Sequence, residues 1–168
     1  IDILRLMGAD ITLENAREVG GEPVADIRVR SAQLKGIDIP EALVPLAIDE
    51  FPVLFVAAAC ASGETRLTGA QELRVKESDR IQVMADGLVA CGIDAQPTPD
   101  GMIIRSSEFT GGEVDAHSDH RIAMAFTMAA LRSSHEILVH DCRNVDTSFP
   151  DFIQACDSIG LKLAAHDV

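Results

Sequence analysis

The clearest pattern along the chain is a stretch in which apolar residues recur at the spacing of an amphipathic helix. These residues are Ile81, Met84, Ala85, Leu88 and Val89. The pattern opens at Ser78 and ends near Gly92, a residue type that often follows the last turn of a helix. We therefore predict one amphipathic helix between these two positions.

Two further stretches, 53–61 and 122–131, are apolar on every side, which indicates buried helices. Asp49 precedes the first and Asp119 precedes the second, each placed to cap a helix N-terminus. Pro52 suits the first turn of a helix, because the backbone N–H that proline lacks is not needed there. We predict that both helices run through the interior of the fold.

Helix ends and short strands alternate along the chain in a repeated unit. Three segments end a helix at a glycine and continue into a short strand, and their glycines are Gly8, Gly92 and Gly160. Other strands are predicted at 26–30, 64–68, 102–105 and 136–140. Ser148 and Asp151 have the spacing of a capping box at the start of a further helix. This mixture predicts an α/β repeat domain with helices inside.

Composition bounds the class of protein. The chain has 168 residues, of which 47% are hydrophobic, which is enough for one globular domain with a core. Its net charge of −13 opposes nucleic-acid binding, and no apolar run approaches the roughly 20 residues that cross a membrane. Its start lacks the features of a signal peptide and resembles the middle of a helix. We expect a soluble, cytoplasmic protein, and we expect this chain to be a piece of a longer one.

The cysteines give a hint about the compartment. They are Cys60, Cys91, Cys142 and Cys156. They lie far apart in sequence, include no CxxC pair, and fall mostly in apolar surroundings. We expect reduced thiols in the core, as is usual for proteins of a reducing compartment.

Charge is concentrated at the predicted helix starts. The segment 74–81, Arg-Val-Lys-Glu-Ser-Asp-Arg-Ile, carries three cations and two carboxylates just before the amphipathic helix. Asp49 and Glu50 precede one buried helix, and 119–121, Asp-His-Arg, opens the other. Helix N-termini favour anionic ligands, although a charged helix start can also be a solvated, salt-bridged surface. Because charge beside a buried helix is costly unless it is paired or binds a ligand, we infer that these starts converge on one face.

The residue types at these helix starts suit a substrate that carries both phosphate and carboxylate groups. Arg80 and Arg121 can hold such groups through a planar fork of donors, and Lys76 offers a compact charge that can exchange a proton. Asp49 and Glu77 are candidates for general acid and base, with pKa values set by the nearby cations. Nothing in the sequence indicates a covalent nucleophile, since no GxSxG motif is present.

A metal site is the competing chemistry. The potential ligands are Asp115, His117, Asp119, His120, His140 and Asp141. However, Arg121 places a fixed cation beside them, and no HExxH motif or other ordered metal spacing is present. We therefore predict no metal and no cofactor, and we expect structural hydrogen bonds for His117 and His120.

Four motifs follow one another along the chain. They are the aspartate at position 49, the charged octet at 74–81, Asp-His-Arg at 119–121 and Thr-Ser-Phe-Pro at 147–150. In this order they resemble the 5-enolpyruvylshikimate-3-phosphate synthase family, over almost the whole chain. The octet is specific, because the related enolpyruvyl transferase that acts on UDP-N-acetylglucosamine is not expected to carry it.

The resemblance implies a fold and a reaction. The fold is a two-domain enzyme made of βαβαββ-type units, with buried parallel helices and sheets outside. Residues 1–168 would form most of its C-terminal domain, and the N-terminal domain would be the missing partner. The reaction moves the carboxyvinyl group of phosphoenolpyruvate to the 5-hydroxyl of shikimate 3-phosphate by addition and elimination, in the pathway to chorismate and aromatic amino acids.

The resemblance also implies roles for single residues. Asp49 would orient the 5-hydroxyl and take its proton, and Lys76 would contact shikimate 3-phosphate beside it. Glu77 would protonate the methylene carbon of phosphoenolpyruvate. Arg80 and Arg121 would bind phosphoenolpyruvate, at the place where glyphosate would also bind.

Three further positions complete the comparison with the family. His120 resembles a secondary catalytic residue. Thr147 stands where better-known members carry a lysine, and Glu72 stands where some carry an asparagine that helps to bind shikimate phosphate. No role is transferred to these last two residues, and both departures are expected of a divergent subgroup.

A non-catalytic binding or assembly module of the same fold is the alternative to an enzyme. The charged set described above is intact, and drift would be expected to erase such a set because it costs stability. The enzyme is therefore the preferred hypothesis. We expect the chain alone to be inactive, because catalysis by two domains depends on their closing around the substrates.

Overall fold

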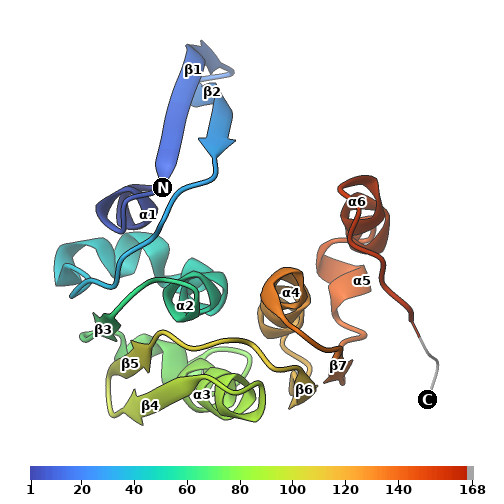
Figure 1. Cartoon of the computed structure of the whole chain (residues 1–168). Coiled ribbons are helices and arrows are strands. Elements are labelled where there is room, and N and C mark those ends of the chain that lie inside the picture. Colours follow the sequence, from blue (N-terminus) through green and yellow to red (C-terminus); the bar gives the residue numbers. More distant parts are fainter. Residues whose placement is uncertain (166–168) are drawn as a thin grey trace.

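The chain forms three small sheets, of which two lie along one side of the helices and the third projects away from them (Figure 1). The structure is a computed structural model that describes residues 1–165. The helices are α1 (Asp2–Leu6), α2 (Phe51–Ala59), α3 (Arg80–Ala90), α4 (His120–Ala129), α5 (Val145–Ser148) and α6 (Phe152–Ser158). The strands are β1 (Asp10–Val19), β2 (Glu22–Arg30), β3 (Glu64–Leu67), β4 (Asp94–Thr98), β5 (Gly101–Arg105), β6 (Gly112–Asp115) and β7 (Ile137–His140). Short 3-10 helices are η1 (Glu41–Leu43), η2 (Pro45–Glu50), η3 (Gln71–Val75) and η4 (Ala130–Arg132).

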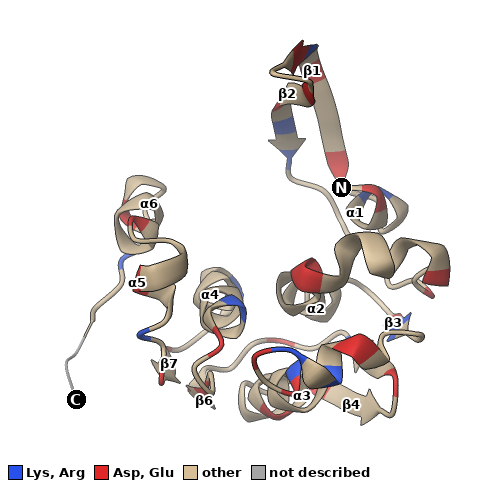
Figure 2. Cartoon of the chain, turned by 180° about the vertical axis from the view of Figure 1, so that it is seen from behind, with Lys and Arg blue, Asp and Glu red and all other residues tan. Residues whose placement is uncertain are grey.

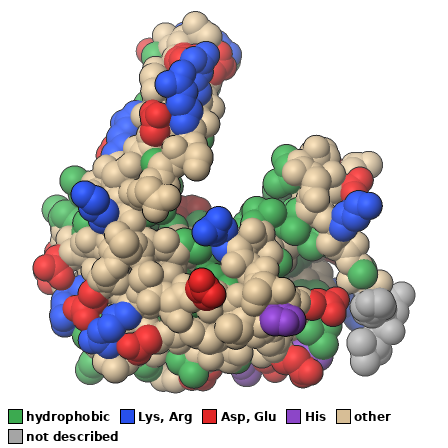
Figure 3. Space-filling model, viewed as in Figure 1, with side chains coloured by type: hydrophobic (Ala, Val, Ile, Leu, Met, Phe, Trp, Pro, Cys, Tyr) green, Lys and Arg blue, Asp and Glu red, His purple; other side chains and the backbone are tan. Residues whose placement is uncertain are grey.

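The sheets differ in the direction of their strands. β1 and β2 form an antiparallel hairpin, β3, β5 and β4 form an antiparallel sheet in that order, and β6 pairs with β7 in parallel. The hairpin projects from the body of the molecule, and most of its residues are exposed (Figure 3). Helices pack against the other two sheets: α2 and α3 contact the β3–β5–β4 sheet, and α4 contacts β7. The sequence-based prediction of an α/β fold is therefore confirmed.

The core lies where α2, α3 and α4 pack against one another. Ile81, Met84 and Leu88 line the inner face of α3 and are fully buried, as their helical spacing predicts. Val89 was assigned to this set but points outward and is 56% exposed. Gly87 allows the close approach of α4, because a Cβ atom there would lie 2.4 Å from the Phe126 ring.

The two predicted interior helices are confirmed as α2, in which seven of nine residues are buried, and α4, in which five of ten are buried. The prediction that Asp49 caps α2 is wrong. Asp49 lies in η2, which runs directly into α2, and the residue at the N-cap is Glu50, which makes no side-chain capping hydrogen bond. Asp119 does cap α4, because its carboxylate accepts the backbone N–H of Arg121.

Two predictions near the end of the chain are wrong. Ser148 does not open a helix but ends α5, and α6 starts only after Asp151, which makes no capping hydrogen bond. Gly160 does have the left-handed φ of +89° that ends a helix, but residues 161–165 form no strand. A strand needs a neighbour to pair with, and none lies beside this segment in the described part of the chain.

The cysteines are all free, but only two of them lie in the core. Cys91 and Cys156 are buried, and burial raises the pKa of the Cys91 thiol to about 11. Cys60 follows the last turn of α2 and Cys142 follows β7, and both are exposed, so the prediction of a core position is wrong for them. Among residues 1–165, no helix has both the length and the apolar character needed to cross a membrane.

Candidate active site

The starts of α2, α3 and α4 meet around the side chain of Arg80, the first residue of α3. Its guanidinium donates to three carboxylates: Nε to Asp119 at 2.8 Å, Nη1 to Asp49 at 3.0 Å and Nη2 to Glu77 at 2.6 Å. Red and blue segments in Figure 2 mark these charged helix starts. Arg80 is only 1% exposed, so the predicted convergence of helix starts is confirmed and its charge is paired inside the protein.

Asp119 is the most buried member of this cluster, with 0% exposure. Its carboxylate accepts from Arg80, from Ser78 Oγ at 3.0 Å and from the backbone N–H of Arg121 at 3.0 Å. Burial alone would raise the pKa of Asp119, but the hydrogen bond and charge of Arg80, aided by Ser78 and the Arg121 N–H, outweigh burial and hold it below its usual range. The carboxylate is therefore ionised at neutral pH.

Lys76 lies beside Asp49 on the side of the cluster that faces solvent. Its Nζ is 3.3 Å from the Asp49 carboxylate and 2.6 Å from that of Glu72. The hydrogen bond to Glu72, with the charge and hydrogen bond of Asp49, raises the pKa of Lys76. Partial burial would raise the pKa of Asp49, but Lys76, Arg80 and Arg121 outweigh it and lower that pKa.

Arg121 joins α4 to the end of η2. Its Nη1 donates to the backbone oxygen of Asp49 at 3.0 Å and to the Glu50 carboxylate at 2.9 Å. Asp49 therefore touches Lys76 and Arg80 through its side chain and Arg121 through its backbone. The residue that was predicted to cap a helix instead lies between all three cations of the cluster.

Three predicted cations thus meet five carboxylates. The cations are Lys76, Arg80 and Arg121, and the carboxylates are Asp49, Glu50, Glu72, Glu77 and Asp119. In the part of the chain that the structure describes, the cluster has no surplus positive charge. An anionic ligand must therefore displace carboxylates from these cations or be bound with the help of cations from another part of the protein.

The charged residues of the octet fall into two groups, which the sequence did not reveal: some fix the local backbone and the others belong to the charged cluster. Arg74 donates to the carbonyl of Pro99 at 2.8 Å and to Asp79 at 2.6 Å, which ties η3 to the turn between β4 and β5. Asp79 also caps α3 by accepting the N–H of Gln82 at 3.0 Å. Arg74 and Asp79 thus fix the local backbone, whereas the other charged residues of the octet belong to the cluster.

The remaining predicted residues make fewer contacts. His120 opens α4 and is partly buried, and within residues 1–165 neither its side chain nor that of His117 makes a hydrogen bond, so that structural prediction is wrong. Thr147 lies in α5 and is exposed. Two of the potential metal ligands contact residues outside that set. Asp119 binds Arg80, and His140 Nε2 lies 3.4 Å from the Glu113 carboxylate.

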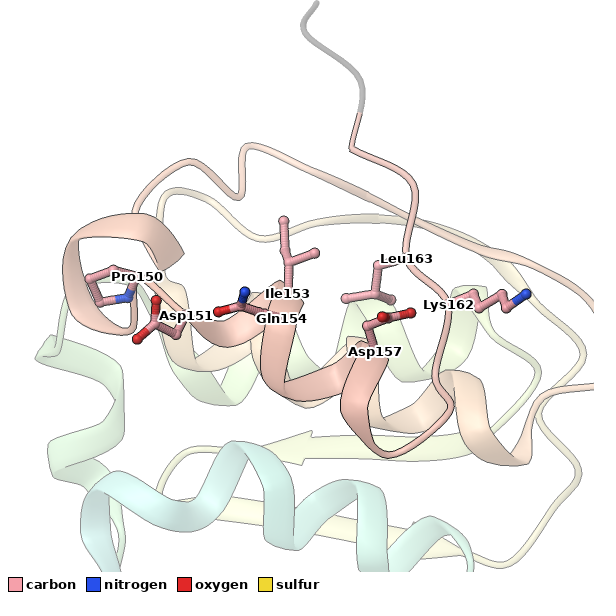
Figure 4. A pocket seen from close by; sticks show the side chains of 7 residues that line it. All are labelled: Pro150, Asp151, Ile153, Gln154, Asp157, Lys162 and Leu163. Carbon is pink, nitrogen blue, oxygen red and sulfur yellow. The ribbon is translucent and has the colours of Figure 1, made fainter.

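A surface cavity of about 690 Å³ lies elsewhere. Figure 4 labels the seven side chains that line it, which come from α6 and the residues on either side. None of them belongs to the charged cluster. The cavity is wide and lies over a single short helix, so we place the candidate active site at the cluster, where three helix starts meet.

Comparison with known proteins agrees with the resemblance in the sequence. The family model described as EPSP synthase (3-phosphoshikimate 1-carboxyvinyltransferase) matches residues 1–156. The 3-phosphoshikimate 1-carboxyvinyltransferase of Alkalilimnicola ehrlichii is 67% identical over 168 residues, which cover 99% of this chain and 38% of that protein. The enzyme of the same name from Methylococcus capsulatus is 66% identical, over 97% of this chain and 37% of its own.

A solved structure extends the similarity to three dimensions. The EPSP synthase from Acinetobacter baumannii superimposes with a TM-score of 0.96 and is 56% identical, over 99% of this chain and 39% of that one. The chain thus spans about two fifths of the length of its relatives. On the evidence of its sequence and its fold, the chain belongs to the EPSP synthase (3-phosphoshikimate 1-carboxyvinyltransferase) family.

Proposed function

We propose that this chain is part of an enzyme that transfers the carboxyvinyl group of phosphoenolpyruvate to the 5-hydroxyl of shikimate 3-phosphate and releases phosphate. In this proposal residues 1–168 supply the C-terminal domain's share of the active site, and the rest of the protein supplies the remainder. The observation that carries the proposal is the cluster around Arg80. The five residues that the family resemblance assigns to the two substrates are joined there in one network.

Substrate binding would exchange partners within this network. The arginine side chains suit the carboxylate and phosphate of phosphoenolpyruvate, because a guanidinium can hold either group through two parallel hydrogen bonds. Glu77 and Asp49 now occupy the outer donors of Arg80, and their side chains are 52% and 46% exposed. Both carboxylates can therefore turn away into solvent when a substrate anion takes their place.

The same exchange would prepare Asp49 to act as a base. In the free protein Lys76 and Arg80 lower the pKa of Asp49, which keeps the carboxylate ionised but makes it a weak proton acceptor. When substrate anions draw these cations away, their effect on Asp49 weakens and its proton affinity rises. Asp49 would then accept the proton of the 5-hydroxyl as the oxygen attacks phosphoenolpyruvate.

Glu77 would deliver a proton to the methylene carbon of phosphoenolpyruvate. It is held at present by Arg80 Nη2 at 2.6 Å. Once the substrate replaces it on Arg80, the Glu77 side chain is free to turn toward that carbon. Its release would therefore follow from the binding of the substrate.

Two further features support this proposal: one concerns the rest of the protein and the other concerns its compartment. The five carboxylates of the cluster leave no surplus positive charge for two anionic substrates, so cations from the rest of the protein would add to those that the exchange of partners releases. The cysteines are free, which agrees with a place in the reducing cytoplasm. The partners are then the two small substrates and the remaining domain.

The test is phosphate release by the full-length protein supplied with both substrates. Glu77→Ala and Arg121→Ala are each expected to lower kcat/KM by about 100-fold or more, because each removes a group that acts on a substrate. Arg105→Ala is the matched control, since Arg105 pairs with Glu64 and Asp94 on the β3–β5–β4 sheet, outside the cluster. Wild-type rates in both variants, with wild-type enzyme active, would show that the roles assigned to them are wrong.

A further inference from the structure

One buried carboxylate touches both helix starts that carry the arginines. Asp119 receives Arg80 Nε at 2.8 Å and lies 3.4 Å from Arg80 Nη2, so it holds the inner edge of the guanidinium. It also accepts the backbone N–H of Arg121, the second residue of α4. The family resemblance assigned no role to Asp119.

The three carboxylates around Arg80 differ in how freely they can leave. Asp119 is fully buried, whereas the side chains of Glu77 and Asp49 are about half exposed. A ligand arriving from solvent can replace the two exposed carboxylates but cannot reach the buried one. Asp119 therefore stays in place and fixes the direction in which the outer donors of Arg80 point.

Ser78 restrains this carboxylate from a third side. Its hydroxyl donates to Asp119 Oδ2 at 3.0 Å, the same oxygen that receives Arg80 Nε. The other oxygen, Oδ1, accepts the N–H of Arg121 at 3.0 Å. With both oxygens engaged, the carboxylate is held in one orientation.

We propose that Asp119, oriented by Ser78, is a positioning residue that holds the guanidinium of Arg80 and the helix start bearing Arg121 in register for one anionic substrate. The inference rests on the proposed function, and it deepens it by adding two residues that act through others. Loss of the carboxylate would loosen both arginines at once. The substrate affected would be phosphoenolpyruvate, for which both arginines are proposed ligands.

The chain contains a matched control for the simpler view that Asp119 is only a helix cap. Asp79 also caps a helix, α3, through the N–H of Gln82, and it also accepts from an arginine, Arg74 at 2.6 Å. Arg74 turns away from the cluster toward the carbonyl of Pro99. Asparagine is a good N-cap, so an Asp→Asn change at either position keeps the cap and removes the charge.

The experiment compares Asp119→Asn with Asp79→Asn in the full-length enzyme. We expect Asp119→Asn to raise KM for phosphoenolpyruvate by about 10- to 100-fold, the usual effect of losing a hydrogen bond between charged groups. In this variant the KM for shikimate 3-phosphate should change by less than about threefold. Asp79→Asn should leave both KM values within about threefold of the wild-type values. Ser78→Ala should raise KM for phosphoenolpyruvate by roughly threefold to tenfold, since it loses one neutral donor.

The outcomes separate this inference from the proposed function. If the wild-type full-length protein releases no phosphate, the proposed function is overturned. If it is active, equal effects of Asp119→Asn and Asp79→Asn, or equal increases in both KM values, overturn the positioning role alone. Should Asp119→Asn fail to fold, as judged by circular dichroism, Ser78→Ala decides, and an unchanged KM for phosphoenolpyruvate overturns the role.

Discussion

Arg80 is a fully charged side chain in a position that is almost closed to solvent. Burial alone would lower its pKa, but Asp119, Glu77 and Asp49 outweigh that effect and raise the pKa of Arg80 above its usual range. Removing one member of a buried ion pair commonly costs about 3–5 kcal/mol of stability, because the other charge is left without a partner. Arg80 is therefore important for the fold as well as for the ligand binding that we propose.

Glu72 offers a test of competition at a single residue. Its carboxylate is 2.6 Å from Lys76 Nζ and 60% exposed, so we expect it to compete with a substrate phosphate for Lys76. In the full-length enzyme we expect Glu72→Gln to lower KM for shikimate 3-phosphate by about twofold to fivefold, in keeping with the small strength of exposed ion pairs.

The control for this change is Glu41→Gln, since Glu41 is an exposed residue whose carboxylate accepts from Thr68 outside the cluster. It should leave KM for shikimate 3-phosphate unchanged. A rise in this KM in Glu72→Gln would show that Glu72 assists binding, and the competition described above would be wrong.

Residue types indicated the members of the charged cluster but not their partners. Lys76, Arg80 and Arg121 were identified from the sequence because each stands at a predicted helix start. Arg74 could not be separated from them, since the carbonyl of Pro99, to which it donates, lies 25 residues away in the chain. Ser78 was overlooked for the same reason, because its contact with Asp119 spans 41 residues.

Helix starts show which local signals are reliable. Asp119 caps α4 as predicted, and the N–H group it accepts lies only two residues away, so a local motif suffices. Asp49 failed as a cap because a preceding 3-10 helix, whose formation has no clear sequence signal, carries the chain straight into α2. Helices were therefore predicted well, and their first turns less well.

Packing between α3 and α4 gives a prediction for the pair of helices. A Cβ atom at Gly87 would lie 2.4 Å from the Phe126 ring and 2.9 Å from Val114. We expect Gly87→Ala to lower the free energy of unfolding by about 1–3 kcal/mol, because overpacking outweighs the gain of about 1 kcal/mol that alanine brings to a helix.

Urea unfolding of the full-length protein would measure this change. Val89→Ala is the control, since Val89 lies on the exposed face of the same helix and its loss should change stability by less than about 0.5 kcal/mol. A Gly87→Ala variant as stable as the wild type would mean that α3 and α4 do not pack as closely as described.

At the scale of the whole molecule, the structure shows what the sequence could not. The hairpin β1–β2 projects into solvent with Ile27 and Val29 exposed, although its alternating residues predicted only that strands exist. The short strand predicted after Gly160 does not form, because strand formation depends on a neighbour. Local patterns thus predict elements, while their partners depend on the fold as a whole.

Acid should weaken the whole molecule through the cluster. Asp49 and Asp119 have pKa values below the ordinary 3.8 in the folded state, so the unfolded chain binds protons more readily than the folded one. Their contribution to stability is complete above about pH 5 and is lost as pH falls through their folded pKa values. Urea unfolding of the full-length protein between about pH 6 and about pH 2 should show this loss, and Asp119→Asn should reduce its slope. An unchanged slope in that variant would contradict the assignment.

The most direct test of the account compares the chain alone with the full-length protein, each supplied with phosphoenolpyruvate and shikimate 3-phosphate. We predict that the full-length protein releases phosphate only when both substrates are present, and that the chain alone releases none above the buffer blank. Steady turnover by the chain alone, or none by the full-length protein, would contradict the claim that this cluster is one part of a transferase active site.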